Sequence, residues 1–418
     1  MSSFTIFGGR ALRGDAVCQG SKNSSLPILA ASILSGGEII LENIPRLSDV
    51  DATLKILNYL GCKTKRENGA VVIDPSGISA SDIPENLMRE MRSSVIFLGA
   101  VLARTGRVEL FSPGGCEIGL RPIDLHLEAI KKLGAEIIDA EGKIVCTAPE
   151  GLTGAVISLS FPSVGATENV MIASCLAHGR TEIRNAAREP EISDLADFLN
   201  AMGAKVSGAG ESTVVIEGVK RLHSATHSVI PDRIAGATLL AAGAITGGVV
   251  RVNGLIPAHL APVIDIFEQA GNEIEIKSDS VLLRAPKRLK SVKTVRTMPY
   301  PGFPTDIQPP IAAMLCKAEG TSVMIETIFE SRYKYIGELI RFGAKVRVDG
   351  RMAVIDGAEK LYPANAVTPD LRGGAALVLA ALSAAGESTI TEIKHIDRGY
   401  ENLERTLSAF SAEIKRTD

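Results

Sequence analysis

Hydrophobic positions along the chain follow two kinds of helical pattern, which alternate with short strands. Six segments are rich in Ala, Leu and Ile on nearly all sides, which predicts helices that are buried all round. They are Ser24–Leu34, Arg92–Ala103, Gly165–Ala177, Ile234–Ile245, Ile307–Cys316 and Arg372–Ala384. Later segments such as Ile192–Met202 and Tyr335–Phe342 carry charges on one face, and we predict outer helices there. Runs such as Arg107–Phe111 and Gly248–Val252 predict the strands between them.

The outer helices are predicted to end at a position that recurs about every 70 residues. That position is occupied by Gly61, Gly134, Gly203, Gly271, Gly343 and, in the sixth case, Ser411. A glycine just after the last helical residue is typical of a left-handed C-cap. Each of these positions precedes a strand-like segment, for example Ala135–Ile138, and turns such as Asn68–Gly69 predict a second strand. We therefore predict an α/β protein of six β-α-β-α-β-β units.

The sixth unit lacks its last strand, and we expect the N-terminus to supply it. Phe4–Gly8 resembles Val214–Gly218 of the third unit. Because 418 residues are too many for one ordinary core, two domains of three units each are predicted. They comprise residues 21–230 and residues 1–20 plus 231–418, and the chain crosses between them near Gln19–Gly20 and Ser228–Pro231.

Composition and charge narrow the classes of function. A net charge of −3 does not favour nucleic acid or an anionic membrane as a partner. The six cysteines form no C-x-x-C pair and the six histidines show no metal spacing, so we expect no metal, no cofactor and a reduced cytosolic location. No signal peptide or membrane-spanning run is predicted. Glycine-rich fingerprints of nucleoside triphosphatases and dinucleotide enzymes are absent from the sequence.

Polar residues are concentrated at the starts of the buried helices. They are Lys22 and Asn23, Arg89 and Arg92, Ser163–Thr167, Asp232 and Arg233, Thr305 and Asp306, and Asp370 and Arg372. Helix N-termini favour anions, so we expect these helices to face a shared cleft between the domains that suits phosphorylated ligands. A capping residue with a solvated charge is the alternative at single sites, and for Asp306 an N-cap role stays open.

A loop at Pro113–Leu125 combines three glycines and two prolines, a composition that excludes a plain helix or strand. It carries a thiol (Cys116), a carboxylate (Glu117) and a guanidinium (Arg121). This layout favours a mobile lid that takes part in chemistry. The alternative is that Cys116 is a small buried hydrophobic residue. Arg121 also stands at the place in its unit that Arg332 and Arg398 occupy in theirs.

The sequence strings at these positions resemble the enolpyruvyl transferases. The matching strings are Gly20–Asn23, Arg89–Ser93, Pro113–Leu125, Ser163–Thr167, Asn185–Glu191, Pro231–Arg233, Pro304–Pro309, Ile328–Glu330, Asp370–Arg372 and Arg398–Tyr400. They span the whole chain. The cysteine loop is similar to that of the family branch that uses a UDP-sugar, and the shikimate-pathway branch lacks it. The resemblance implies a two-domain inside-out α/β barrel with its active site in the cleft.

The resemblance also implies a reaction. The enolpyruvyl group of phosphoenolpyruvate would be transferred to the 3′-hydroxyl of UDP-N-acetylglucosamine with release of phosphate, the first committed step of peptidoglycan synthesis. Lys22, Arg121 and Arg398 would hold phosphoenolpyruvate. Cys116 would be the general acid and the covalent target of fosfomycin, and Asp306 the general base. The implied UDP-sugar and substrate contacts are Asn23, Arg92, Arg121, Pro122, Ile123, Asp124, Leu125, Ser163, Val164, Gly165, Asp306, Ile328, Phe329, Arg332, Asp370 and Arg372. Phe161 stands where some family members carry a lysine.

Three alternatives remain open at this point. The first is the shikimate-pathway transfer on the same fold. The second is a catalytically idle paralogue that binds the UDP-sugar or a protein partner, although intact Cys116, Asp306, Lys22 and Arg398 argue against it. The third is a repeat scaffold without a site, which predicts scattered charges rather than charges gathered at helix starts.

Overall fold

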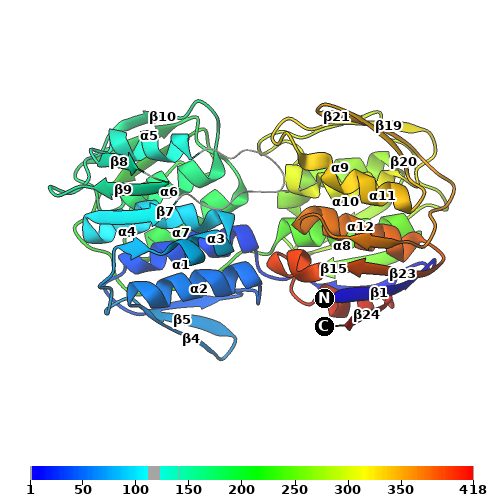
Figure 1. The fold of residues 1–418 in the computed structure, drawn as a ribbon, viewed down its shortest axis with the longest axis horizontal. Helices are drawn as coiled ribbons and strands as arrows, with labels where there is room; N and C mark the ends of the chain where they lie inside the picture. Colours follow the sequence, from blue (N-terminus) through cyan, green and yellow to red (C-terminus); the bar gives the residue numbers. More distant parts are fainter. Residues whose placement is uncertain (1, 112–122, 141, 418) are drawn as a thin grey trace. The chain divides into compact units, whose positions relative to one another are not determined.

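The structure is a computed structural model that describes residues 2–111, 123–140 and 142–417 (Figure 1). The described residues divide into two compact units. The first unit consists of residues 20–111, 123–140 and 142–230, and the second of residues 231–417 together with residues 2–19. Each unit contains three four-stranded sheets in its described part.

The three sheets of the first unit share one strand order. They are β14 (Ala225–Ser228), β3 (Ile39–Glu42), β5 (Ala70–Asp74) and β4 (Lys63–Glu67); β6 (Asp82–Ile83), β7 (Arg107–Phe111), β9 (Lys143–Thr147) and β8 (Glu136–Ala140); and β10 (Val156–Ser158), β11 (Arg180–Arg184), β13 (Thr213–Glu217) and β12 (Lys205–Ser207). In every sheet the first strand pairs parallel to its neighbour and the other pairs are antiparallel.

The sheets of the second unit repeat this arrangement. They are β2 (Arg13–Val17), β15 (Val249–Asn253), β17 (Ser280–Arg284) and β16 (Glu273–Ile276); β18 (Thr294–Arg296), β19 (Thr321–Ile325), β21 (Met352–Asp356) and β20 (Lys345–Asp349); and β22 (Asn365–Val367), β23 (Gly386–Thr391), β1 (Ser3–Gly8) and β24 (Glu413–Thr417). In each of these sheets the first two strands form the parallel pair: β2 with β15, β18 with β19, and β22 with β23.

The inner helices are α1 (Lys22–Ala31), α4 (Phe97–Thr105), α6 (Val164–Ser174), α8 (Arg233–Thr246), α10 (Gln308–Leu315) and α12 (Leu371–Ser383), with short 3-10 segments η1 (Ser32–Leu34), η2 (Arg92–Ile96) and η4 (Thr305–Ile307) beside α1, α4 and α10. All six predicted buried helices are present, with ends shifted by a few residues. Residues Arg372–Ser383 of α12 are all buried, as an all-round apolar helix requires.

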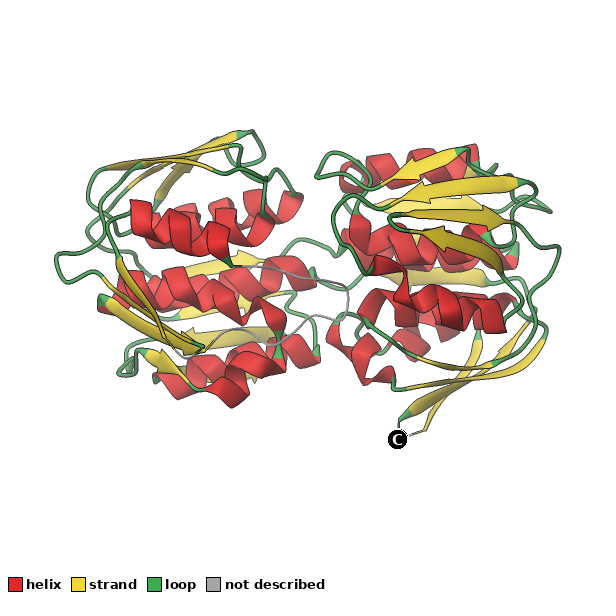
Figure 2. Ribbon diagram, turned by 45° about the horizontal axis from the view of Figure 1, so that its top comes forward, coloured by secondary structure: helices red, strands yellow, loops and turns green. Residues whose placement is uncertain are grey.

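The outer helices are α2 (Ser48–Leu60), α3 (Glu85–Glu90), α5 (Asp124–Lys132), α7 (Pro190–Ala201), α9 (Ala261–Gln269), α11 (Ile336–Arg341) and α13 (Leu403–Ser408), with η3 (Pro257–Leu260), η5 (Arg332–Tyr335) and η6 (Ile393–Arg398) before the last three. Within each unit the sheets lie outside the inner helices (Figure 2). This is the predicted inside-out α/β barrel with six repeated units, so the predicted fold class is confirmed.

The predicted helix ends are confirmed by backbone conformation. Five glycines and one serine after the outer helices have positive φ. The angles are 105° at Gly61, 93° at Gly134, 95° at Gly203, 89° at Gly271, 83° at Gly343 and 65° at Ser411. The left-handed conformation lets each helix turn directly into its next strand. Because Ser411 adopts the same conformation, the sixth unit keeps the geometry without the glycine.

The N-terminal strands belong to sheets of the second unit. β1 lies between β23 and β24, with Ser3 opposite Thr391 on one side and Thr417 on the other. Phe4 and Ile6 of β1 are fully buried, so the strand contributes to the core. β2 pairs in parallel with β15. The strand that the sixth unit lacks at its own end is therefore supplied by the start of the chain.

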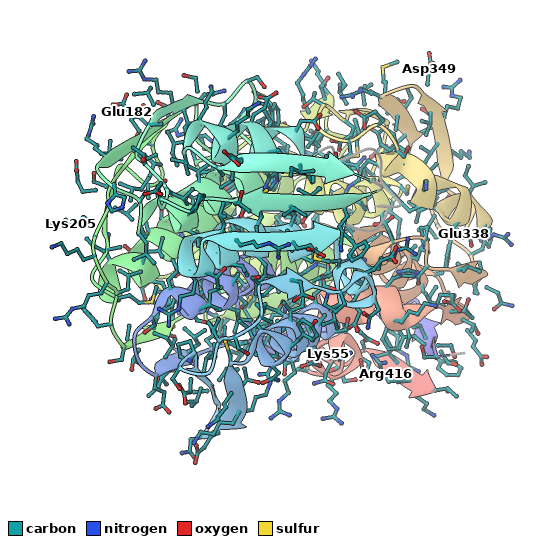
Figure 3. All side chains as sticks on the ribbon, turned by 60° about the vertical axis from the view of Figure 1, so that its left-hand side comes forward. Lys55, Glu182, Lys205, Glu338, Asp349 and Arg416 are labelled. Atoms are coloured by element: carbon teal, nitrogen blue, oxygen red, sulfur yellow. The ribbon has the colours of Figure 1, made fainter. Side chains whose placement is uncertain are left out.

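Each unit has one hydrophobic core built around its inner helices. In the first unit Leu29, Val101 and Ile172 lie in it, and in the second Leu240 and Leu379. Charged side chains lie outside: Lys205 on β12 points away from the ribbon (Figure 3). The helix starts that carry the predicted site residues are therefore held on rigid, buried elements.

Candidate active site

Lys22 and Asn23 lie at the first turn of α1 in the first unit. The Ser21 hydroxyl caps this helix by accepting the Ser24 N–H at 3.2 Å. Lys22 Nζ lies 2.7 Å from Asp49 Oδ2, and the two side chains are only 10% and 3% exposed. Asp49 comes from the first turn of α2. This buried ion pair fixes an ammonium group at a helix start, where an anionic ligand is favoured.

A second buried carboxylate, Asp194 on α7, holds the same helix start. Its Oδ1 lies 2.8 Å from His227 Nε2, and its Oδ2 accepts the Ser24 hydroxyl and the Ile230 N–H, the latter at 3.3 Å. Asp194 therefore ties α1 to the segment that ends the first unit.

The prediction that the outer helix Ile192–Met202 carries its charges on one outer face is wrong for Asp194, and Glu191, just before that predicted helix, is buried as well. Glu191 is 2% exposed and Asp194 3% exposed. Both are spaced at helical intervals from the buried Leu195 and Phe198, so they lie on the core-facing side. A carboxylate on an apolar helix face was the sequence signal that could have identified this network.

The start of α6 carries Ser163, Val164 and Gly165. The Ser163 hydroxyl accepts the Ala166 N–H at 3.3 Å, and its carbonyl accepts the Thr167 N–H at 3.0 Å. Helix α6 is 11 residues long, and the amides of its first turn favour an anion. α5, which begins at Asp124 after Ile123 and includes Leu125, packs against α6.

Glu168 is a buried carboxyl one turn into α6. Burial raises its pKa well above the ordinary value, and the nearby Glu191 and Glu189 carboxylates raise it further. At a pH between the ordinary glutamate pKa and this raised pKa, Glu168 is protonated in the folded protein and ionised in the unfolded chain.

We expect Glu168→Gln to raise stability at pH 8 relative to wild type. The stabilisation that protonated Glu168 provides is fully present below the ordinary glutamate pKa and is lost as the pH rises toward the raised folded value. Glutamine keeps the neutral shape and has no such loss. Urea unfolding at pH 5 and pH 8 measures this difference, with the exposed Glu128→Gln as control. Equal pH dependences in the wild type and Glu168→Gln would contradict the assignment.

In the second unit, Asp306 is held by two arginines. Its Oδ1 accepts Arg332 Nη2 at 2.8 Å, and its Oδ2 accepts Arg372 Nη2 at 3.4 Å. Both guanidinium side chains are 2% exposed, and Asp306 is 28% exposed. Arg332 also donates to the Thr305 carbonyl, with Nη2 at 2.8 Å. A carboxylate on a helix start thus stands between two buried cations.

The N-cap interpretation of Asp306 is wrong. Neither η4 nor α10 has a side-chain cap bond, and the Asp306 carboxylate faces arginines instead. Asp232 and Asp370 are the caps at the starts of α8 and α12: Asp232 accepts the Ile234 N–H at 2.8 Å and Asp370 the Arg372 N–H at 3.0 Å. Oδ2 of Asp370 and both Nε and Nη1 of Arg372 are buried without a hydrogen-bond partner among the described residues.

Glu326, which the sequence analysis missed, organises the loops around Asp306. It is fully buried directly after β19. Its Oε1 accepts the Thr297 hydroxyl at 3.0 Å and the amides of Ile328 and Phe329 at 2.8 and 3.1 Å. Its Oε2 accepts the Thr305 hydroxyl at 3.0 Å. One carboxylate therefore joins the Thr305–Asp306 turn to the Ile328–Phe329 segment, two predicted substrate-contact regions. In the local sequence, only its position just before the Ile328–Glu330 string indicated that Glu326 lies near the site.

Arg398 ends η6 and is half-buried. The turn that follows it is held by Gln19, whose Nε2 donates to the Gly399 carbonyl at 3.1 Å and whose Oε1 accepts the Glu401 N–H at 2.7 Å. Tyr400 lies under the Arg372 guanidinium, 5.2 Å from the ring centroid. Arg332 in η5 and Arg398 in η6 both precede outer helices, which is the equivalence that the sequence predicted for them.

Some predicted residues cannot be placed in this geometry. Cys116, Arg121 and Pro122 lie outside the described residues, as does the side chain of Arg92. Arg89 pairs with Glu85 at 2.5 Å on an exposed face, with a side chain that is 66% exposed. Arg89 is therefore a solvated surface charge, which was the alternative to a site residue.

The other five cysteines are buried. Burial raises the pKa of Cys62, Cys175 and Cys316 to about 12 and that of Cys146 to about 11, and it also raises that of Cys18. Thiolates are the reactive form, so burial disfavours reaction at these five thiols.

The described part of the chain contains no cluster of three or more His, Cys, Asp or Glu side chains that could hold a metal ion. Among its helices, none is both long and apolar enough to cross a membrane.

Known proteins match this chain over nearly its whole length. A family model described as EPSP synthase (3-phosphoshikimate 1-carboxyvinyltransferase) matches residues 6–407. The chain is 49% identical over 416 residues to UDP-N-acetylglucosamine 1-carboxyvinyltransferase 2 of Caldanaerobacter subterraneus subsp. tengcongensis, with all of both chains covered. It is 47% identical to UDP-N-acetylglucosamine 1-carboxyvinyltransferase 1 of Symbiobacterium thermophilum, over 99% of this chain and 95% of the relative. The structure of the enolpyruvyl transferase NikO from Streptomyces tendae is similar with a TM-score of 0.90 and 26% identity, over 100% of this chain and 99% of that one.

Proposed function

The chain belongs to the enolpyruvyl (1-carboxyvinyl) transferase family, and we propose that it transfers the enolpyruvyl group of phosphoenolpyruvate to the 3′-hydroxyl of UDP-N-acetylglucosamine with release of phosphate. Its 49% identity over full length to a relative of that name is the observation that carries the proposal. The reaction opens peptidoglycan synthesis. We accordingly propose a cytoplasmic enzyme of cell wall formation, which cell shape and cell division require.

The residues fit an addition followed by an elimination. In the addition, the sugar 3′-oxygen bonds to the central carbon of phosphoenolpyruvate, a base takes the hydroxyl proton, and an acid protonates the vinyl carbon. In the elimination, the new methyl group loses a proton and phosphate leaves. We assign the base to Asp306 and the acid to Cys116. Each such proton transfer contributes roughly 10²–10⁴-fold to the rate.

Fixed cations suit the anionic groups of phosphoenolpyruvate. We assign Lys22, Arg121 and Arg398 to its phosphate and carboxylate, since arginine and lysine form strong charge-assisted hydrogen bonds with both. The buried pair of Lys22 with Asp49 supports this role, because the ammonium is held in place before a ligand arrives.

The remaining predicted contacts are assigned to the UDP-sugar. The start of α6 at Ser163–Gly165 suits the diphosphate. The buried groups of Asp370 and Arg372 without hydrogen-bond partners among the described residues support a polar ligand at the start of α12, because such groups cost about 1–3 kcal/mol each when left unpaired. Further proposed contacts are Asn23, Arg92, Arg121, Pro122, Ile123, Asp124, Leu125, Asp306, Ile328, Phe329 and Arg332.

A phosphate-release assay tests the function. We expect phosphate from phosphoenolpyruvate with UDP-N-acetylglucosamine as acceptor, and none with shikimate 3-phosphate. Release only with shikimate 3-phosphate would favour the transfer for which the matching family model is described. Binding of UDP-N-acetylglucosamine without release under either condition would indicate an idle paralogue.

Fosfomycin and cysteine substitution test the proposed acid. Fosfomycin is expected to stop phosphate release and to add its mass to Cys116. Because the five other cysteines are buried, a thiol reagent applied to the native enzyme should label Cys116 alone. Unchanged turnover in Cys116→Ala would remove the thiol from the mechanism.

A further inference from the structure

Tyr400 has no role in the chemistry described so far, although it is buried beside the start of α12. It is 2% exposed, and the guanidinium carbon of Arg372 lies 5.2 Å from the centroid of its ring. At this distance a buried aromatic ring attracts a cation. Tyr400 therefore contacts one of the two arginines that hold the proposed base, Asp306.

The two arginines beside Asp306 are held in different ways. Arg332 donates to the Thr305 carbonyl from both Nε, at 3.2 Å, and Nη2, at 2.8 Å. Nε and Nη1 of Arg372 have no hydrogen-bond partner among the described residues. A main-chain acceptor therefore fixes the guanidinium of Arg332, whereas that of Arg372 packs on the ring of Tyr400.

The hydroxyl of Tyr400 is anchored to α8 through Thr238. Its oxygen lies 3.0 Å from Thr238 Oγ1, and Thr238 is 1% exposed. Thr238 Oγ1 also lies 2.8 Å from the Ile234 carbonyl, which can only accept a hydrogen bond. Because the threonine hydroxyl has one hydrogen and gives it to that carbonyl, Tyr400 is the donor to Thr238.

The main chain around Tyr400 is fixed as well. The Tyr400 N–H donates to the Ile396 carbonyl at 3.0 Å. Gly399 lies so close to α12 that an added methyl group would be 2.7 Å from Leu371 Cδ2. Glycine thus lets this turn approach the first residue of α12. Since both its main chain and its hydroxyl are held, the ring of Tyr400 is a rigid surface for Arg372.

Building on the proposed function, we propose that Tyr400 is a positioning residue that holds Arg372 against Asp306 and so keeps this base oriented toward the sugar 3′-hydroxyl. Arg372 Nη2 lies 3.4 Å from Asp306 Oδ2, while Oδ1 is bound by Arg332. A guanidinium that moved away would release Oδ2 alone and let the carboxylate turn. A misplacement of about 1 Å in an active site can cost about 10²-fold in rate.

Kinetics of the intact enzyme test this role. Tyr400→Phe loses the hydrogen bond to Thr238, and we expect kcat at saturating substrates to fall about 3- to 10-fold. Tyr400→Leu also loses the ring, and we expect a fall of about 10- to 100-fold. KM for phosphoenolpyruvate should change less than about threefold. A raised KM for phosphoenolpyruvate with unchanged kcat would show that Tyr400 supports the neighbouring Arg398 instead, and would overturn the proposal.

A double-mutant cycle separates positioning from general packing. In the Asp306→Asn enzyme, Tyr400→Leu is expected to lower kcat by less than about twofold further, because the carboxylate through which Tyr400 acts is already lost. The same fold loss in both backgrounds would mean that Tyr400 acts independently of Asp306. A lower melting temperature with unchanged kcat in Tyr400→Leu would mean that the ring only packs. Either result would overturn the proposal.

Two threonines of α8 give a matched pair of variants. Thr238→Val should reproduce the kcat of Tyr400→Phe, since it removes the acceptor of the same hydrogen bond. Thr246→Val is the control: the Thr246 hydroxyl donates to the Ala242 carbonyl at 2.8 Å and accepts the Leu12 N–H at 3.3 Å. It should leave kcat unchanged.

Equal losses of kcat in Thr238→Val and Thr246→Val would indicate a general loosening of α8 and would overturn the proposal. Failure of the proposed function would look different, because the wild type itself would then release no phosphate with UDP-N-acetylglucosamine, and the role assigned to Tyr400 would fail with it.

Discussion

Asp306→Asn is expected to lower kcat for phosphate release by about 10²- to 10⁴-fold. Asparagine keeps the size of the side chain, and its carbonyl oxygen can still accept from Arg332, which lies 2.8 Å from Asp306 Oδ1. Its NH₂ group replaces the oxygen that lies 3.4 Å from Arg372 Nη2 and cannot accept from that arginine. It cannot take the proton of the sugar hydroxyl. Initial rates at saturating phosphoenolpyruvate and UDP-N-acetylglucosamine measure the loss.

Stability must be measured beside the rate. Because the substitution leaves two buried guanidinium groups around a neutral amide, we expect a loss of about 1.5–3 kcal/mol in the free energy of unfolding. Asp356→Asn on β21 is the control, since Asp356 pairs with the exposed Arg347 at 3.3 Å on the surface of the same unit. Turnover of Asp306→Asn within about threefold of wild type would assign proton removal to another group.

Glu326→Ala is expected to lower the free energy of unfolding by more than about 3 kcal/mol. The substitution leaves two amides and two hydroxyls without their acceptor in a fully buried place. Activity should fall as well, because the Thr305–Asp306 turn and the Ile328–Phe329 segment lose the group that joins them. Urea unfolding gives the stability and phosphate release the activity.

Glu326→Gln is the matched comparison for this position. Its carbonyl oxygen can still accept from the amides of Ile328 and Phe329, and its NH₂ group can donate to the Thr305 hydroxyl. We expect it to retain most of the stability that the alanine variant loses. Equal losses in the two variants would mean that the carboxylate charge, rather than its hydrogen bonds, stabilises this region.

Features with a repeated local pattern could be predicted from the sequence. Gly61, Gly134 and Gly203 marked helix ends because the left-handed conformation is costly for other residues, and the buried helices were recognisable by composition. The position of the N-terminal strand followed from counting strands per unit. The candidate site residues on helix starts, such as Lys22 and Asp306, were found because polar residues recur at equivalent places in the repeat.

Features that depend on contacts between distant segments could not be predicted in this way. Asp49, Asp194 and Glu326 are buried carboxylates that bind groups from distant parts of the same unit, and the local sequence does not identify those distant partners. The role of Asp306 shows the same limit, because an N-cap and an arginine-paired carboxylate have the same local sequence. Only the register of the folded elements separates the two.

The position of β1 in its sheet determines when the second unit can finish folding during synthesis. Every strand described in the first unit has been made once residue 228 is reached, so this unit can fold while the chain is still attached to the ribosome. β1 leaves the ribosome first, yet its partners β23 and β24 end at Thr391 and Thr417. β1 therefore waits for partners made more than 370 residues later, and the second unit closes its final sheet only after Thr417 has been made.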